Sequence, residues 1–288
     1  MSNISVRSSG NNKPLPNNAI TKVTFYKNCI DTVTSTSGIA RTSPLLRYRR
    51  YSKNKYIDTE TGEILTYNDN NAKNDNTKSV KHSMKNIYSL VLNNFAEQES
   101  FYITLTYSYH MDDFNKANND FAAFIDKFKY RMGEIKIEYL KVIEAQESGS
   151  WHFHVLIKSS NYRYFRMTKG KVEDCWKHGS VKIQQVYDTK GLALYLGGRF
   201  NNTGGYKTKM TKKSDRWKYY PIGARIFSKS SGIVYPKTVT VQRGDLVNAL
   251  KDYKKLNESD IVVIDEKTDR VLNRIRYETY ENPSKFSI

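Results

Sequence analysis

Two histidines, His152 and His154, alternate with apolar residues in the segment WHFHVLI. Because successive side chains of a strand point to opposite faces, both imidazoles would lie on one face while the apolar residues enter the core. If residues 147–149 form the loop of a hairpin, Glu144 in the preceding strand lies opposite His152. Two neutral imidazoles and a carboxylate can bind a divalent cation and leave positions for a phosphate oxygen and water. The spacing therefore predicts a metal site formed by Glu144, His152 and His154.

A second interpretation of these residues is a sheet surface with two solvent-facing histidines and a glutamate that only adds charge. For an arbitrary His-x-His sequence this is the commoner outcome. A slip of one residue in the pairing would also turn Glu144 to the opposite face. The convergence of three ligand-type side chains in a basic protein favours the metal site.

The segments around this hairpin predict the elements that must position it. Residues 101–107 are β-branched and aromatic, as in a strand. Apolar residues at helical spacing then predict a helix that begins after Asp112 or Asp113 and ends at Gly133. The later elements expected from pattern are strands at 139–145 and 151–157, a short helix at 171–179 closed by Gly179, a strand at 181–187, and a helix at 189–196 that ends at Gly197 and Gly198.

This order, β-α-β-β-α-β-α, predicts an α+β fold with a ferredoxin-like, split βαβ core, in which an antiparallel sheet carries helices on one face. We expect a basic N-terminal region with an Asn-rich linker at 67–76, a core, and a C-terminal α+β extension. The corresponding ranges are 1–76, 77–200 and 201–288. Further elements are expected as helices at 78–96 and 246–256 and strands at 224–229, 261–265 and 271–280.

The charge of the chain points to a polyanionic partner. The 288 residues include 47 Lys and Arg against 29 Asp and Glu, a formal charge of +18, which is most often held by nucleic acid. Aromatic residues make up 13 % of the chain, which excludes a disordered basic tail. Residues 1–15 lack an apolar secretory segment, and no run reaches the roughly 18 apolar residues of a membrane helix. With two distant cysteines, Cys29 and Cys175, that form no metal pattern, the chain is expected in the cytoplasm.

Two basic segments, 41–56 and 199–220, are interleaved with aromatic residues. Cations that follow a backbone and rings that stack on bases are typical of single-stranded nucleic-acid binding. A solvated loop explains either segment taken singly, but two of them around one candidate metal site favour DNA. The expected contacts are Arg47, Arg49, Arg50, Lys207, Lys209, Lys212, Lys213, Arg216 and Trp217.

The segments FYITLTY, VIEAQESGSWHFHVLI and GLALYLGGRF occur in this order within residues 101–200. They resemble the three motifs of HUH endonucleases and, more narrowly, those of rolling-circle replication initiators of Gram-positive plasmids, filamentous phages and microviruses. The segments PIGARIFSKSSGIVYP and TGEI are also similar to the plasmid initiators, though less specifically.

The resemblance implies an HUH nuclease core in which Glu144, His152 and His154 bind Mg²⁺ or Mn²⁺, Thr104 and Thr106 line the site, and Tyr195 is the nucleophile. A phenol with a pKa of about 10 is a weak nucleophile at neutral pH, so it needs a scissile phosphate polarised by the metal. The product would be a covalent phosphotyrosine and a free 3′-OH that could prime synthesis.

The chain departs from the usual third motif, which has a lysine three residues after the tyrosine. Gly198 stands there, so Arg199 or Lys190 would have to supply the positive charge. Tyr187 and Lys190 also satisfy the Y-x-x-K pattern, which makes Tyr187 a rival nucleophile. Tyr195 is preferred because it lies on the helix after the strand, while Tyr187 lies at the strand's end.

The sequence thus predicts an enzyme that nicks and rejoins single-stranded origin DNA in rolling-circle replication. Alternatives are a conjugative relaxase, a single-tyrosine transposase, or a non-enzymatic single-stranded DNA-binding module whose binding is indifferent to metal. Because no Walker-type loop is present, a host helicase is an expected partner, together with a host DNA polymerase. No membrane partner is expected, and the oligomeric state is left open.

Overall fold

The computed structural model describes residues 4–8, 13–37, 48–50, 55–58, 63–66, 72–159, 165, 167–197, 216, 219–221 and 223–282. In this part of the chain, helices combine with antiparallel sheets, so the predicted α+β class is confirmed. The chain divides into two compact units. Unit 1 comprises Met1–Lys73, Asn201–Gly205 and Pro236–Ile288, and unit 2 comprises Asn74–Phe200 and Tyr206–Tyr235. The division into three parts expected from the sequence stays a prediction.

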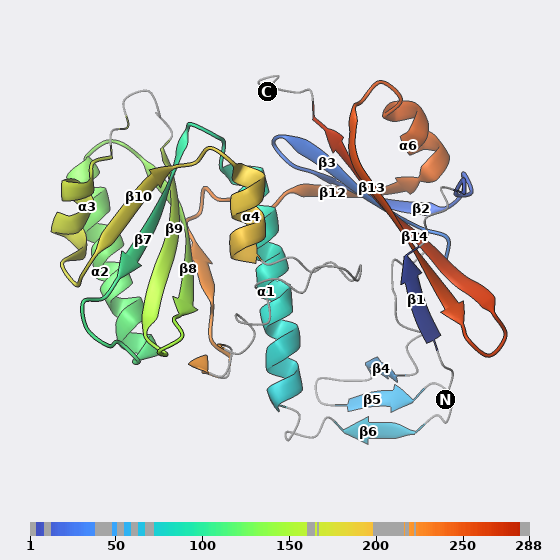
Figure 1. Cartoon of the computed structure of the whole chain (residues 1–288), viewed down its shortest axis with the longest axis horizontal. Coiled ribbons are helices and arrows are strands. Elements are labelled where there is room, and N and C mark those ends of the chain that lie inside the picture. The colour runs from blue at the N-terminus through green and yellow to red at the C-terminus, as the bar shows by residue number, and fades with distance from the viewer. Residues whose placement is uncertain are drawn as a thin grey trace. The chain divides into compact units, whose positions relative to one another are not determined.

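Unit 2 is built on a five-stranded sheet with the order β10-β7-β9-β8-β11 (Figure 1). Its strands are β7 (Ser100–Thr106), β8 (Ile137–Ala145), β9 (Trp151–Ser159), β10 (Val181–Gln185) and β11 (Phe227–Lys229). Every neighbouring pair is antiparallel. Since β7 and β8 both pair antiparallel with β9, they are parallel to each other, and β9 lies between them. β11 is shorter than the strand expected at 224–229.

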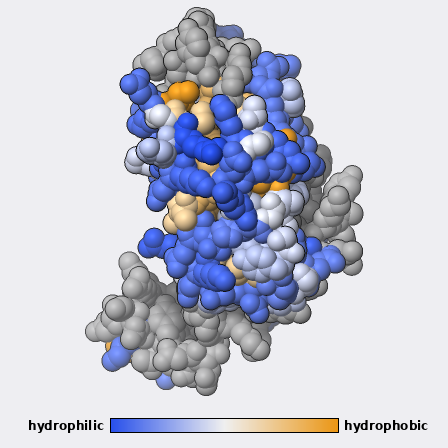
Figure 2. Space-filling model, turned by 90° about the vertical axis from the view of Figure 1, so that its left-hand side faces the viewer, coloured by the Kyte–Doolittle hydropathy of each residue, from blue (hydrophilic) through white to orange (hydrophobic). Residues whose placement is uncertain are grey.

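Helices lie on both faces of this sheet (Figure 1). Helices α2 (Phe114–Met132) and α3 (Lys169–Trp176) share one face, where the ring centroids of Phe121 and Trp176 lie 5.3 and 5.8 Å from that of Phe153. Helix α4 (Thr189–Gly197) lies on the opposite face, because its Tyr195 ring contacts His154. The expectation of helices on one face therefore holds for α2 and α3 and is wrong for α4. Figure 2 shows that the outer surface on the side of α2 and α3 is mostly hydrophilic, as expected for helices that bury one face.

Local capping explains where α2 and α3 end. The Asp113 carboxylate accepts hydrogen bonds from the backbone N–H groups of Asn115 and Lys116, both at 2.9 Å, and Gly133 closes α2 with φ +61°, as predicted. Helix α3 is closed instead by Lys177, whose φ is +56°, so the prediction of Gly179 as its cap is wrong. Gly179 follows two residues later, where the chain passes against the end of β7.

We predict that Gly179→Ala destabilises unit 2. A Cβ on Gly179 would collide with the backbone carbonyl oxygen of Thr106 and lie 2.5 Å from the backbone nitrogen of Ser108. Because backbone atoms cannot turn aside, we expect a loss of about 1–3 kcal/mol of unfolding free energy, measured by thermal or urea unfolding. Gly170→Ala in α3 is the control, since its Cβ meets nothing within 4 Å and the change should be neutral or stabilising by up to about 1 kcal/mol. Equal stability of the two variants would contradict the prediction.

Helix α1 (Ala72–Asn94) begins earlier than expected. The sequence predicts a helix at 78–96 and a linker at 67–76, but residues 72–76 are helical, and residues 67–71 lie outside the described part of the chain. The polar first turns carry no apolar periodicity, so the pattern could not show them. The helix ends at Asn94, whose side-chain amide donates to the carbonyl oxygens of Leu90 at 2.8 Å and Val234 at 2.7 Å.

Unit 1 contains a six-stranded antiparallel sheet of order β1-β13-β14-β3-β2-β12 and a three-stranded sheet of order β4-β5-β6. The strands of the larger sheet are β1 (Ile4–Ser8), β2 (Ile20–Phe25), β3 (Cys29–Ser35), β12 (Lys237–Gln242), β13 (Lys255–Asp265) and β14 (Arg270–Glu281). Those of the smaller sheet are β4 (Tyr48–Arg50), β5 (Lys55–Asp58) and β6 (Ile64–Thr66). Only β13 and β14 were expected from the sequence.

Helix α6 (Arg243–Ala249) covers one face of the larger sheet. Leu246 and Leu250 join Val23, Ile30 and Tyr280 in one apolar cluster. The helix predicted at 246–256 is therefore misplaced, because Leu250 already leaves helical geometry and β13 begins at Lys255. None of the helices in the described residues is long and apolar enough to cross a membrane.

Candidate metal centre and tyrosine site

The hairpin of β8 and β9 has the register expected from its loop. Glu144 pairs with His152, and the backbone N–H of Gln146 donates to the carbonyl oxygen of Ser150 at 2.8 Å. Gly149 turns the chain with φ +86°, a conformation that other residues rarely adopt. The carboxylate and both imidazoles therefore lie on the same face of the sheet.

One ligand-type atom from each of Glu144, His152 and His154 lies within 4.8 Å of the others. The Nε2 atoms of the two histidines are 3.1 Å apart, and His154 Nε2 lies 3.4 Å from Glu144 Oε2. Both histidines are buried, with 8 % and 3 % of their surface exposed. Two imidazole nitrogens and a carboxylate oxygen that converge in this way fit a divalent cation which keeps water or phosphate oxygens at its other positions.

A guanidinium group borders this cluster. Arg216 Nη1 lies 3.1 Å from Glu144 Oε1, and its Nη2 lies 3.3 Å from Glu147 Oε1 in the hairpin loop. Nearby, the hydroxyl of Tyr220 donates to the carbonyl oxygen of Ile143 at 2.9 Å. A phosphate that approached Glu144 would therefore meet a positive charge that is already positioned.

Tyr195 is the predicted nucleophile that the fold brings to the cluster. Its ring, 51 % exposed, lies edge-on to His154 with centroids 5.7 Å apart. Burial and the Glu144 carboxylate raise the pKa of its phenol, against the smaller opposing effects of a hydrogen bond from Tyr102 and the Arg216 charge. The phenol is therefore protonated at neutral pH and needs help to become a nucleophile.

The fold separates the rival tyrosine from this arrangement. Tyr187 follows β10, is 67 % exposed, and donates its hydroxyl hydrogen bond to Gln185 Oε1 at 2.9 Å. Within the described residues, no ring contact or hydrogen bond joins it to the histidines. Lys190 lies exposed in the first turn of α4. The geometry therefore favours Tyr195 over Tyr187.

The remaining predicted residues fall into two groups. Thr104 and Thr106 of β7 pair with His154 and His152, so they share the face of the cluster. Arg49 and Arg50 form part of β4, for which only the backbone is described. The predicted residues outside the described part of the chain are Arg47, Arg199, Lys207, Lys209, Lys212, Lys213 and Trp217.

One functional candidate was missed from the sequence. The Tyr102 hydroxyl lies 2.6 Å from His154 Nδ1, and the two rings stack with centroids 5.6 Å apart. The same hydroxyl hydrogen-bonds with Thr104 and Tyr195, and burial raises its pKa. Its position two residues before Thr104 was the available signal, because strand alternation places both side chains on one face.

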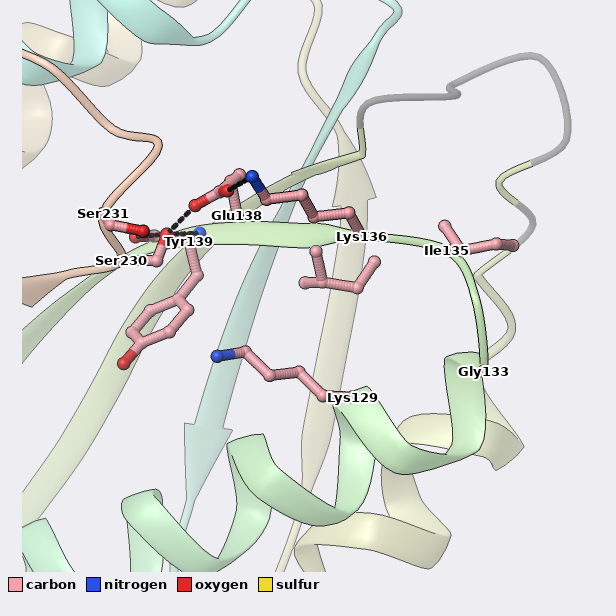
Figure 3. Close-up of a pocket in the computed structure, with 9 residues that line it drawn as sticks. Lys129, Gly133, Ile135, Lys136, Glu138, Tyr139, Ser230 and Ser231 are labelled. Atoms are coloured by element: carbon pink, nitrogen blue, oxygen red, sulfur yellow. Dashed lines mark hydrogen bonds and ion pairs between the residues drawn. The ribbon is translucent and has the colours of Figure 1, made fainter.

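A separate cavity of about 350 Å³ lies at the start of β8, away from the cluster (Figure 3). Its polar groups are engaged with one another. Glu138 accepts hydrogen bonds from the Ser230 hydroxyl at 2.5 Å and the Gly232 N–H at 3.0 Å, and Lys136 Nζ lies 3.3 Å from it. These contacts fasten the chain after β11 to β8, which is a structural role.

The segment that holds the cluster also matches a known family. Residues 100–220 match the family model of the replication-associated protein ORF2, over less than half of the chain. The match indicates a protein associated with DNA replication and is consistent with a rolling-circle replication initiator. No curated protein and no solved structure matches the chain.

Proposed function

We propose that this protein initiates rolling-circle replication by nicking and rejoining single-stranded origin DNA through a covalent 5′-phosphotyrosine. One observation carries the proposal: a buried Glu-His-His cluster lies against a half-exposed tyrosine inside the segment that matches replication-associated proteins. A non-enzymatic DNA-binding protein would not need this convergence. A conjugative relaxase or a single-tyrosine transposase would use the same groups on a different DNA.

The proposal includes a ferredoxin-like HUH core in unit 2. The support is the element order β7-α2-β8-β9-α3-β10 and the insertion of β9 between the parallel strands β7 and β8, which is the split βαβ arrangement. This topology serves the chemistry because it puts β7, β8 and β9 side by side. The candidate ligands then come from adjacent strands, while α4 supplies the tyrosine from above the same face.

The reaction is a transfer of one phosphoryl bond. The Tyr195 oxygen attacks the phosphorus of the scissile phosphodiester, and its phenolic proton passes to water. The bond from phosphorus to the 3′ oxygen breaks, and that oxygen takes a proton from water to become a free 3′-OH. The 5′ phosphate stays on Tyr195, so the energy of the phosphodiester is kept and attack by another 3′-OH rejoins the strand.

Glu144, His152 and His154 would hold a divalent cation, Mg²⁺ or Mn²⁺, which as a Lewis acid would make the scissile phosphate a better electrophile. Arg216 would contact the phosphate from the other side of Glu144 and neutralise part of its charge. This places on Arg216 the electrostatic role that the usual lysine has and that Gly198 cannot have. Thr104 and Thr106 would line the same face.

The DNA strand would extend from this site over the basic segments at 41–56 and 199–220, with their interleaved aromatic residues. A host helicase and a host DNA polymerase would act on the nicked origin, since the chain has no Walker-type loop. Both partners and a cytoplasmic location stay predictions.

The test is a covalent adduct assay on denaturing gels. The full chain is mixed with labelled single-stranded DNA from its own locus, in Mn²⁺ or in EDTA. We expect a covalent band in Mn²⁺ that EDTA abolishes. His154→Ala should lower Mn²⁺ affinity at least tenfold, measured by calorimetry without DNA, whereas His110→Ala on an exposed loop should not change it.

Tight DNA binding that is indifferent to EDTA, with no covalent band, would overturn the nuclease and favour the binding module. An adduct that forms equally well in EDTA would keep the tyrosine chemistry and overturn the metal role. Specificity for the origin of transfer or for an element's end, in place of the replication origin, would identify a relaxase or a transposase.

A further inference from the structure

The Tyr102 hydroxyl stands between the candidate metal ligand His154 and the candidate nucleophile Tyr195. It is 2.6 Å from His154 Nδ1, and it hydrogen-bonds with Tyr195 and with Thr104. Stacking of the Tyr102 and His154 rings, with an interplanar angle of 18°, fixes the hydroxyl in this place. Three polar partners therefore surround one hydroxyl on the face of the cluster.

We infer that Tyr102 is a positioning residue that couples cation binding at His154 to the readiness of Tyr195 for attack. The inference rests on the proposed function and adds a device to it. In this device, the occupancy of the metal centre decides in which direction the Tyr102 hydroxyl donates its single hydrogen bond.

The direction follows from the number of donors and acceptors. His154 Nε2 faces Glu144 and His152, so a cation held there needs the lone pair of Nε2, and the ring proton must be on Nδ1. Nδ1–H then donates to the Tyr102 oxygen. A hydroxyl oxygen has two lone pairs and one proton. With Thr104 as the second donor, the proton of Tyr102 is left for the Tyr195 oxygen.

This donated hydrogen bond aids the reaction because negative charge develops on the Tyr195 oxygen as the phenol loses its proton. Without a cation, the other tautomer of His154 becomes available, in which Nδ1 accepts the Tyr102 proton. The Tyr195 oxygen then loses its donor. Tyr102 thus makes the nucleophile ready only when the metal centre is filled, which would prevent attack in the absence of the cation.

Tyr102→Phe tests the inference, since it removes the hydroxyl and keeps the ring that stacks on His154. We expect its Mn²⁺ affinity, measured by calorimetry on the full chain without DNA, to fall by about 10–100-fold. At saturating Mn²⁺ the single-turnover rate of adduct formation should still be about tenfold below that of the wild type, which corresponds to one lost hydrogen bond of about 1.4 kcal/mol.

Tyr107→Phe is the matched control. Tyr107 follows the same strand, and its hydroxyl donates to Asp120 Oδ2 at 3.0 Å on the opposite face, so its loss should leave both measurements unchanged. Thermal unfolding of both variants verifies that they fold.

Three results would overturn the inference. Unchanged affinity and rate in Tyr102→Phe would remove the role altogether. Lower affinity with a wild-type rate at saturating Mn²⁺ would limit Tyr102 to His154 and exclude the link to Tyr195. A wild-type chain that neither binds Mn²⁺ nor forms an adduct would overturn the proposed function itself, and the inference with it.

Discussion

Tyr195→Phe is expected to abolish the covalent protein–DNA adduct, whereas Tyr187→Phe should form it at close to the wild-type rate. The hydroxyl of Tyr195 is the only group removed from a ring that lies 5.7 Å from that of His154. Without an oxygen, no phosphotyrosine can form, so the loss should be complete. Tyr187 is exposed, and its hydroxyl bonds with Gln185. The measurement is the denaturing-gel assay with labelled single-stranded DNA in Mn²⁺.

Two further measurements make this comparison decisive. Binding of the same DNA to Tyr195→Phe should stay within a few-fold of wild type, because the cluster and Arg216 remain. An isotope-labelled peptide map of the wild-type adduct should find the nucleotide on the peptide that contains Tyr195. Loss of the adduct in Tyr187→Phe alone would keep the function and move the nucleophile. Persistence of the adduct in both variants would point to a residue outside this pair.

The parts of the site that the sequence predicted are those set by short-range geometry. The hairpin register follows from a three-residue loop with Gly149 at a positive φ, and this register alone places Glu144 opposite His152. The start of α2 follows from Asp113 in the same way, since a carboxylate at this position caps backbone N–H groups. In both cases one or two residues determine the local conformation, so a single sequence is sufficient to identify it.

The parts that could not be predicted depend on contacts between distant segments. Arg216 lies 72 positions from Glu144, and only the folded chain shows that it reaches the carboxylate. Gly179 looks like a helix cap in the sequence, but its lack of a side chain is needed for the approach to Thr106. The strands of unit 1 are rich in Thr, Lys and charged residues, and their apolar alternation is weak. Their pairing depends on β14, more than two hundred residues from β3.

The weak alternation of unit 1 has a physical reason: its sheet buries an ionic cluster. The Glu278 carboxylate, with none of its side chain exposed, pairs with the Arg243 guanidinium and accepts from Lys255 Nζ at 2.8 Å. The Tyr280 hydroxyl also donates to it at 3.0 Å. Charged residues therefore occupy inward positions at which a hydrophobic pattern would be expected.

Glu278→Gln is expected to destabilise unit 1 by about 3–5 kcal/mol at pH 7, because it leaves the charge of Arg243 buried without its partner. Urea unfolding followed by far-UV circular dichroism measures the loss. Tryptophan fluorescence provides an internal reference, since the ranges of unit 1 contain no tryptophan and this signal reports on unit 2. Glu281→Gln on the same strand is the control, because its exposed side chain is 3.9 Å from Lys254 and should contribute less than about 0.5 kcal/mol.

The pH dependence gives a second, independent test of the same cluster. Burial alone would raise the pKa of Glu278, but the hydrogen bonds and charges of Arg243 and Lys255 outweigh it and lower the pKa to about 2. Because an unfolded glutamate titrates near about 4.3, the ionised carboxylate contributes its full stabilisation, about 3 kcal/mol, above that pH. Between about pH 4.3 and 2 the unfolded state binds the extra proton, so this contribution falls as the pH falls. The difference in unfolding free energy between wild type and Glu278→Gln should therefore be constant from pH 7 to 5 and shrink towards pH 3. A difference that grows in acid would mean that the carboxyl group is protonated in the folded protein and that the cluster is held by hydrogen bonds to a neutral acid.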